Sequence, residues 1–396
     1  MLSPEHRAIV TATVPLLEQG GEALTRHFYL NLFRDYPEVL PFFNQANQRD
    51  GAQQRALAGA VLAYARNIER LEALGPLVET IVNKHVSLQI QPQHYPLVGA
   101  SLLQAIREVL GADIATDEVI AAWGAAYVQL ADVLGGAERQ IYQAQLAASG
   151  GWNGARRFVV VRKVVESEEI SSFVLAPQDG GAVMAHAPGQ YIGLRVVVDG
   201  LEQRRQYSLS AASDGATYRI SVKRENGGVV SNFLHEQVGE GDVLDLFPPA
   251  GAFVLRDVSG PAARPLVLIS GGVGITPTLA MLEAALASGR PIHFIHAARN
   301  GRVHAFREHI DALERDNPQL QRFYCYEDGD DSDAAAHADG YIDTALLQRW
   351  LPASPDVDAY FLGPLPFMRA VKRSLAELGV PTSQTHYEFF GPSKEL

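Results

Sequence analysis

The spacing of apolar residues divides the chain into parts with different periodicities. Over residues 1–146, apolar positions recur three or four residues apart, as at Leu77, Ile81 and His85. Such spacing places the side chains on one face of a helix. Alternation typical of strands is absent, and Gly and Pro cluster between the periodic stretches. We therefore expect an all-α domain over this range.

The stretch SGGWNG (149–154) interrupts the helical pattern, and we interpret residues 147–154 as a linker. Beyond it, β-branched and aromatic residues alternate with polar ones, as in TYRISVK (217–223). Short runs of this kind, separated by turn signals, are typical of half-buried strands. Residues 155–258 are therefore expected to form a small antiparallel β-barrel or sandwich.

The pattern changes again at residue 264. PLVLIS (265–270) predicts a buried strand, which GGVGITP and a helical run follow. PIHFIHAA predicts a second strand and RVHAFREHIDALERD a second helix, and DAYFLGP leads into a helix over about 366–378. Strands that alternate with helices indicate a doubly wound α/β domain with a parallel sheet, over residues 264–396.

Composition narrows the class of protein. The chain is 47% hydrophobic and 20% charged, with a net charge of −12, which argues against a nucleic-acid surface. It has one cysteine, Cys325, which excludes an intrachain disulfide and fits a reducing compartment. No run approaches 18 apolar residues, and no signal peptide is evident. We expect a cytoplasmic protein without membrane insertion.

The glycine-rich segment between the first strand and helix of the last domain is a candidate phosphate loop. Small residues let the backbone approach a pyrophosphate, and a helix N-terminus offers free N–H groups. Thr276 can cap that helix, with Pro277 in its first turn. The loop residues are Gly271, Gly272, Val273, Gly274, Ile275 and Thr276. The alternative is a tight strand-to-helix turn that binds nothing.

A second candidate lies in RQYSLS (205–210). Strand alternation puts Arg205 and Tyr207 on one face. A guanidinium can pair with a phosphate, and a tyrosine ring can lie flat on a planar ligand. The alternative is an ordinary cross-strand pair.

The order of four motifs provides a resemblance. R-x-Y-S, GGVVS (227–231), GGVGITP and LGPLPFM (362–368) together resemble the ferredoxin–NADP reductase superfamily. The resemblance covers residues 155–396 and implies an FAD-binding barrel domain followed by an NAD(P)-binding domain. In the barrel domain, the residues that it assigns to FAD are Tyr191, Arg205, Gln206, Tyr207, Ser208, Gly228 and Ser231. It assigns the glycine-rich loop at 271–276 to the nicotinamide dinucleotide.

The C-terminal EFFGP also resembles that superfamily, in which an aromatic residue covers the flavin ring. The residues concerned are Glu388, Phe389, Phe390, Gly391 and Pro392. Our choice for the covering residue is Phe390, with Glu388 beside it. Leu362 stands where the superfamily has a cysteine near the nicotinamide, which puts a thiol contact in doubt. The donor is NADH or NADPH, and Arg299 and Arg302 are candidates for a 2′-phosphate contact.

His85 in NKHVSL has two interpretations. A lone histidine on an apolar helical face is more often a structural core residue than a ligand. Here Phe42-Phe43, Tyr29 in HFYLNLF, and Gln53 and Leu57 on one helical face accompany it, with Tyr95 and Glu138 polar among apolar neighbours. With the reductase-like part, the whole chain resembles the bacterial flavohaemoglobins, and NKH, NQRDG, QYP and EFFGP stand at the family's places.

The resemblance implies a globin domain that holds haem b over residues 1–146, with His85 as the proximal iron ligand. Tyr29, Gln53 and Leu57 would line the opposite side, and Phe43 would contact the haem. Glu138 would accept the His85 ring N–H, and Tyr95 would fix that carboxylate. Lys84 would link the haem side to the flavin domain. An apolar ligand in the distal pocket is compatible with these residues.

The implied activity is that of a nitric oxide dioxygenase, with nitric oxide and O₂ as substrates and NAD(P)H as electron donor. Electrons would pass from NAD(P)H to FAD and on to the haem. The sequence leaves three alternatives open. One is an NAD(P)H-dependent reductase that acts on peroxides, ferric iron or quinones. Another is a sensor of O₂ or nitric oxide. The third is a helical half that binds no haem.

Overall fold

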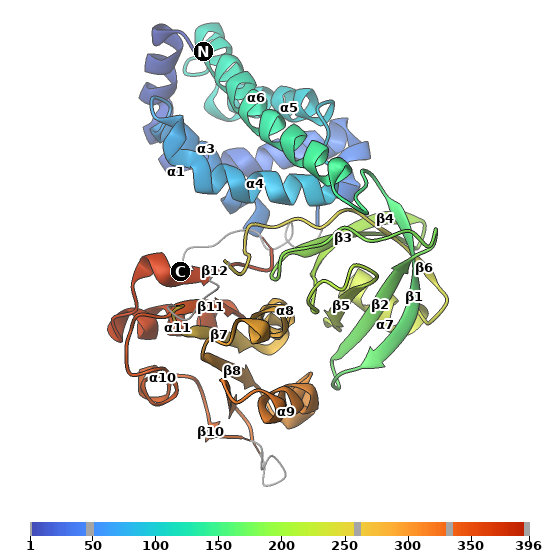
Figure 1. Cartoon of the computed structure of the whole chain (residues 1–396). Helices are drawn as coiled ribbons and strands as arrows, with labels where there is room; N and C mark the ends of the chain where they lie inside the picture. The colour runs from blue at the N-terminus through green and yellow to red at the C-terminus, as the bar shows by residue number, and fades with distance from the viewer. Residues whose placement is uncertain (1, 45–50, 257–262, 330–335, 392–396) are drawn as a thin grey trace.

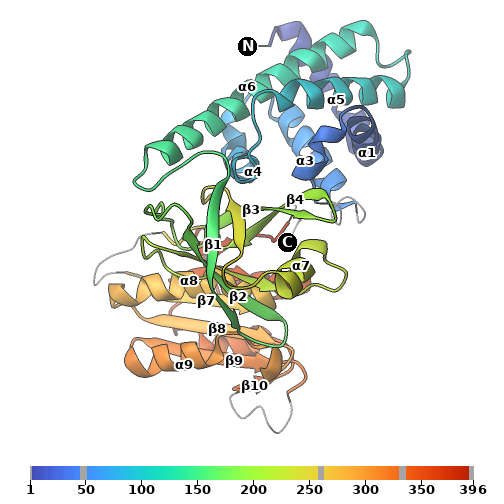
Figure 2. The ribbon, with the colours of Figure 1, turned by 90° about the vertical axis from the view of Figure 1, so that its right-hand side faces the viewer.

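The computed structural model has three parts, which Figure 2 shows as stacked layers with the antiparallel sheet in the middle. The structure describes residues 2–44, 51–256, 263–329 and 336–391. Helices occupy one end and a parallel sheet the other, and the C-terminal segment runs between them (Figure 1). The fold class therefore agrees with the sequence: an all-α part, an antiparallel barrel and a doubly wound α/β part.

The helical part is built from long helices with an aromatic and aliphatic core. Ser3 caps the first helix by accepting from the N–H of His6, 3.1 Å away, and Pro4 begins it. The core includes Phe28, Leu32 and Trp123. The elements are α1 (Pro4–Asp35), η1 (Pro37–Phe42), α3 (Ala52–Arg66), η2 (Leu71–Leu74), α4 (Gly75–Leu88), α5 (His94–Leu110) and α6 (Asp117–Ala147).

By length and composition alone, α6 is apolar enough to cross a membrane. It packs against α1, α4 and α5, and it carries the buried carboxylate of Glu138. One helix of this kind is weak evidence for a membrane span, and its contacts place it within the helical part.

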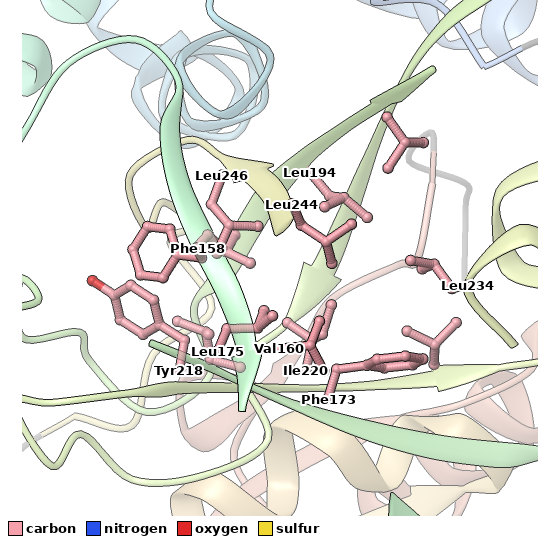
Figure 3. Close-up of a cluster of buried hydrophobic side chains, with 14 of the residues drawn as sticks. Phe158, Val160, Phe173, Leu175, Leu194, Tyr218, Ile220, Leu234, Leu244 and Leu246 are labelled. Atoms are coloured by element: carbon pink, nitrogen blue, oxygen red, sulfur yellow. The ribbon is translucent and has the colours of Figure 1, made fainter. Parts of the chain in front are cut away.

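The middle part is a six-stranded antiparallel sheet in the order β4-β3-β6-β1-β2-β5. A bridge between Leu209 and Ile220 joins its two edges, which closes the sheet into a barrel. Phe158, Phe173 and Tyr218 are among the side chains that fill its interior (Figure 3). The elements are β1 (Arg156–Val165), β2 (Ile170–Pro177), β3 (Tyr191–Val198), β4 (Leu201–Ser208), β5 (Tyr218–Lys223), α7 (Val229–Gln237) and β6 (Val243–Leu246).

The last part is a parallel sheet in the order β10-β9-β8-β7-β11-β12. All six residues of β7 are buried, as a strand covered on both faces requires. The main elements are β7 (Leu266–Gly271), η3 (Gly272–Gly274), α8 (Ile275–Ala285), η4 (Leu286–Ser288), β8 (Ile292–Ala298), η5 (Gly301–Val303), α9 (Arg307–Asp316) and β9 (Leu320–Tyr326). They continue with β10 (Ala338–Asp339), α10 (Thr344–Trp350), β11 (Asp358–Leu362), α11 (Leu365–Glu377), η6 (Thr382–Gln384) and β12 (Thr385–Tyr387).

Candidate active site

One side chain from each of α4, α5 and α6 meets inside the helical part. The Nδ1 atom of His85 lies 2.7 Å from Oε1 of Glu138, and the hydroxyl of Tyr95 donates to the same oxygen over 2.6 Å. The Glu138 side chain is 3% exposed, whereas that of His85 is 31% exposed. The carboxylate is thus enclosed, and one edge of the imidazole remains open.

This arrangement selects a tautomer of His85. A carboxylate accepts hydrogen bonds, so a neutral His85 ring has its proton on Nδ1, facing Glu138, and its lone pair on Nε2. A neutral imidazole with a free Nε2 is a metal ligand. Burial, together with Glu138, raises the pKa of Tyr95, so its hydroxyl stays a donor. The residues present therefore fit a haem iron on the open edge of His85.

The predicted distal residues lie on α1 and α3 of the helical part. Tyr29 on α1 is 4% exposed, and its ring lies 5.6 Å from that of Phe43 and 5.6 Å from that of Phe33. Leu57 on α3 packs against the cluster that contains Tyr29. Gln53 lies one turn before Leu57 and is half-buried. Much of NQRDG lies outside the described residues.

Lys84 connects the helix of His85 to the C-terminal segment. Its ammonium donates to the carbonyl of Gly391, and burial lowers its pKa. Burial raises the pKa of Glu388 to about 7, although the charge of Lys84 acts in the opposite direction. Phe390 is 51% exposed, whereas Phe389 packs on the core of the parallel-sheet part. Pro392 lies outside the described residues.

The strand with the R-x-Y-S motif is β4. Tyr207 packs on the barrel core, and burial lowers the pKa of Arg205 and raises that of Tyr207. Ser208 pairs with Tyr191 of β3, which brings these two candidates together. Gln206 points to the other face, where its amide donates to the hydroxyl of Ser87 in α4.

Tyr191 lies at the contact between the barrel and the helical part. It is 7% exposed and clusters with Val82 and Val86 of α4 and Leu134 of α6. Burial raises its pKa, with the charge of Glu388 acting in the same direction. Tyr191 therefore touches the helix of His85 directly, which the sequence pattern did not indicate.

The GGVVS stretch begins a helix that the sequence analysis missed. Gly228 is the N-cap of α7, and a Cβ there would lie 2.4 Å from the Ser231 hydroxyl. That hydroxyl also accepts from the N–H of Glu225 over 3.2 Å. The N-terminus of α7 offers N–H groups to an anion, which suits a pyrophosphate.

The GGVGITP loop lies between β7 and α8, as expected. Gly272 has a φ of 54°, and a Cβ on Gly274 would lie 2.2 Å from the carbonyl oxygen of Leu362. Both glycines are therefore required by the backbone. One detail of the prediction was wrong: Gly274 is the N-cap of α8, and the hydroxyl of Thr276 donates to the carbonyl of Val273 instead of capping.

Three further positions differ from simple expectation. Leu362, at the end of β11, is fully buried in the core between the sheet and α8. Arg299 pairs with Glu169 of the barrel, and Arg302 lies 3.6 Å from Glu168. Both arginines thus join the barrel to the parallel-sheet part. A contact with a 2′-phosphate would have to compete with these carboxylates.

Sequence reasoning missed several residues where the barrel meets the helical part. The guanidinium of Arg204 lies over the ring of Phe42, 4.3 Å from its centre, and donates to the carbonyl of Leu88. Asn83 accepts from the N–H of Gly251 over 2.8 Å. Alternation along β4 places Arg204 and Arg205 on opposite faces of the strand. That pattern does not indicate that a second domain covers the face with Arg204.

Comparison with known proteins agrees with this architecture. The family model "Globin" matches residues 26–134, "Oxidoreductase FAD-binding domain" residues 157–255, and "Oxidoreductase NAD-binding domain" residues 268–373. These three domains define the class: a haem-, FAD- and nicotinamide dinucleotide-binding oxidoreductase.

The full-length relatives specify the family. A flavohemoprotein of Burkholderia sp. is 64% identical over 100% of both chains. The crystal structure of a flavohemoglobin from Malassezia yamatoensis, with bound FAD and heme, covers 98% of this chain and 100% of its own at 29% identity, with a TM-score of 0.87. The FAD/NAD-binding domain of a nitric oxide dioxygenase from Vibrio cholerae covers 61% of this chain and 100% of its own at 40% identity, with a TM-score of 0.55. The chain belongs to the flavohemoprotein family.

Proposed function

We propose that the protein is an NAD(P)H-dependent nitric oxide dioxygenase, which combines nitric oxide and O₂ into nitrate. When bound, FAD and haem supply hydride acceptance, single-electron transfer and O₂ binding. The observation that carries the proposal is the enclosed Glu138 carboxylate, which holds both His85 and Tyr95. The name of the Vibrio cholerae neighbour supports the same activity.

Glu138 and Tyr95 control the orientation and basicity of the His85 imidazole. Glu138 accepts the Nδ1 proton of His85, and Tyr95 keeps the carboxylate in place. A carboxylate partner makes an imidazole more basic, and a more basic ligand donates more electron density to the iron. This favours activation of O₂ over its reversible storage.

The distal residues position the substrates. The Tyr29 ring is held by Phe33 and Phe43, so its hydroxyl has a restricted set of orientations. The hydroxyl can donate a hydrogen bond to O₂, whose oxygen atoms would carry partial negative charge when bound. Leu57 packs against the same core cluster as Tyr29, where its apolar side chain helps to exclude water.

The electron supply uses the two other domains. Gly272 and Gly274 let the α8 N-terminus receive the dinucleotide pyrophosphate, and β4 presents Arg205 and Tyr207 to the flavin. The helix of His85 contacts both this barrel and the C-terminal tail through Gln206 and Gly391. A continuous protein path therefore connects the donor site to the haem side.

Rapid mixing tests the proposal. The full-length holoprotein, reduced with NADH and equilibrated with O₂, is mixed with nitric oxide in a stopped-flow instrument, and nitrate is quantified. We expect nitrate in proportion to nitric oxide consumed. Tyr29→Phe is expected to lower that rate by about 10- to 100-fold, because one preorganised donor is lost. Nitrate formation no faster than in buffer would reject the proposal.

A further inference from the structure

The last turn of α4, directly after His85, rests on the barrel. Ser87 and Leu88 belong to this turn, and they contact residues of β3 and β4. The face of β4 that meets them is opposite to the face with Arg205 and Tyr207. Strand β4 therefore presents the flavin candidates Arg205 and Tyr207 on one face, and its other face, with the further candidate Gln206, meets the haem-bearing helix.

Gly193 in β3 marks the closest approach. A Cβ at this position would lie 2.1 Å from the carbonyl oxygen of Ser87 and 2.8 Å from a ring carbon of Phe247. Gly193 is not among the glycines with positive φ, so backbone conformation does not require a glycine here. The glycine is needed because another backbone comes close.

Arg204 fixes the same turn from the neighbouring strand. Its guanidinium lies between two rings, 4.3 Å from the centre of Phe42 in the helical part and 5.2 Å from that of Phe247 in the barrel. It also donates to the carbonyl of Leu88. That carbonyl is at the C-terminal end of α4, where a cation is favoured by the helix dipole.

Ser87 links these contacts to the helix interior. It accepts from the Gln206 amide and donates to the carbonyl of Lys84 over 2.8 Å. We propose that Gly193 and Arg204 are positioning residues that set the separation of flavin and haem, and thereby the rate of electron transfer between them. In that step reduced flavin loses one electron and ferric haem iron gains it, with no bond formed or broken.

The inference rests on the electron path of the proposed function, but its test does not involve nitric oxide. Gly193→Ala adds one methyl group, which forces α4 and β3 apart by about 1 Å. Electron tunnelling falls off exponentially with the distance between donor and acceptor, so a displacement of that size should slow the transfer several-fold. Gly239→Ala is the matched control, since a Cβ there meets nothing closer than an Asp242 oxygen at 3.8 Å.

The experiment mixes full-length holoprotein with NADH in the absence of O₂ and follows flavin and haem absorbance separately. For Gly193→Ala, we expect flavin reduction within about twofold of the wild type and haem reduction slowed several-fold, beyond that margin. Gly239→Ala should match the wild type in both. Hydrogen exchange of the intact protein without added NADH gives a second readout, in which amides of residues 86–90 should exchange faster in Gly193→Ala.

Arg204→Gln keeps the inference testable if Gly193→Ala does not fold. It removes the cation between the two rings while leaving the close contact in place, so a several-fold slowing of haem reduction alone is expected. The inference is overturned if haem reduction in the folded variants stays within about twofold of the wild type. Absence of nitrate formation in the wild type would instead count against the proposed function. It would not affect the inference, because haem reduction is measured without nitric oxide.

Discussion

The hydrogen bond between Tyr95 and Glu138 allows a quantitative test of the proximal site. Tyr95→Phe removes the hydroxyl that donates the hydrogen bond over 2.6 Å, and Glu138→Gln removes the negative charge of the acceptor. Both substitutions nearly preserve side-chain volume, so packing changes little. A double-mutant cycle of the two isolates the pairwise free energy.

The magnitude follows from charge and burial. A hydrogen bond to an ionised acceptor contributes about 1.5–3 kcal/mol to stability, roughly twice a neutral one. Glu138 is 2% exposed, so solvent screens the interaction little. We therefore expect a coupling free energy of about 1.5–3 kcal/mol. Because burial raises the pKa of Tyr95, the coupling should persist into mildly alkaline solution.

The assay is urea unfolding of the four holoproteins, followed by circular dichroism. Tyr64→Phe, combined with Glu138→Gln, is the matched control, because the hydroxyl of the buried Tyr64 donates to the carbonyl of Ala126 instead. The control pair should be additive within about 0.5 kcal/mol. The reasoning is refuted if the effects of Tyr95→Phe and Glu138→Gln on the free energy of unfolding are also additive within about 0.5 kcal/mol.

Three further predictions concern other parts of the molecule. The pKa of Glu388 is raised from 4.5 to about 7, so its protonated form stabilises the fold and this contribution is lost as the pH rises through that interval. Lys84→Met removes the cation that lowers the pKa of Glu388, so the loss of stability should extend to higher pH. The measurement is the midpoint of urea unfolding as a function of pH. Gly274→Ala should lower the free energy of unfolding by about 1–3 kcal/mol and weaken NADH binding, measured by calorimetry. Glu169→Gln should release Arg299 and raise kcat/KM for NADPH by up to about fivefold, since an exposed ion pair contributes at most about 1 kcal/mol.

Each of these has a contradicting outcome. Identical pH profiles for wild type and Lys84→Met would show that the ammonium does not act on Glu388. Unchanged unfolding of Gly274→Ala would mean that the loop accommodates a methyl group against Leu362. If kcat/KM for NADH rises as much as that for NADPH in Glu169→Gln, the pair with Arg299 does not affect 2′-phosphate recognition. For Gly274→Ala, the packing control is Gly239→Ala.

Local periodicity was sufficient for most of the fold. Ser3 and Pro4 signal the start of α1, and the uninterrupted apolar run in β7 signals a strand buried on both faces. Helix α7 was missed because GGVVS reads as a loop, and the helix that follows Gly228 is short. Helix α9 begins at Arg307, later than expected, because Phe306 before it adopts a left-handed conformation with a φ of 64°.

Contacts between domains could not be predicted from local pattern. Arg204 resembles a solvent-facing position of an edge strand until the helical part is placed on it. Gln206, which the sequence assigned to FAD, contacts Ser87 of the same part. Arg299 resembles a phosphate ligand until Glu169 of the barrel is brought beside it. Residues within one element follow from periodicity, whereas residues between domains depend on how the domains pack.

Isotope labelling tests the central claim most directly. The holoprotein turns over with NADH, unlabelled nitric oxide and ¹⁸O₂, and the nitrate is analysed by mass spectrometry. A dioxygenase places both atoms of O₂ in the product, so we predict nitrate with two heavy oxygens, lost in His85→Ala. Product with one heavy oxygen or none, or unchanged doubly labelled nitrate from His85→Ala, would contradict the account.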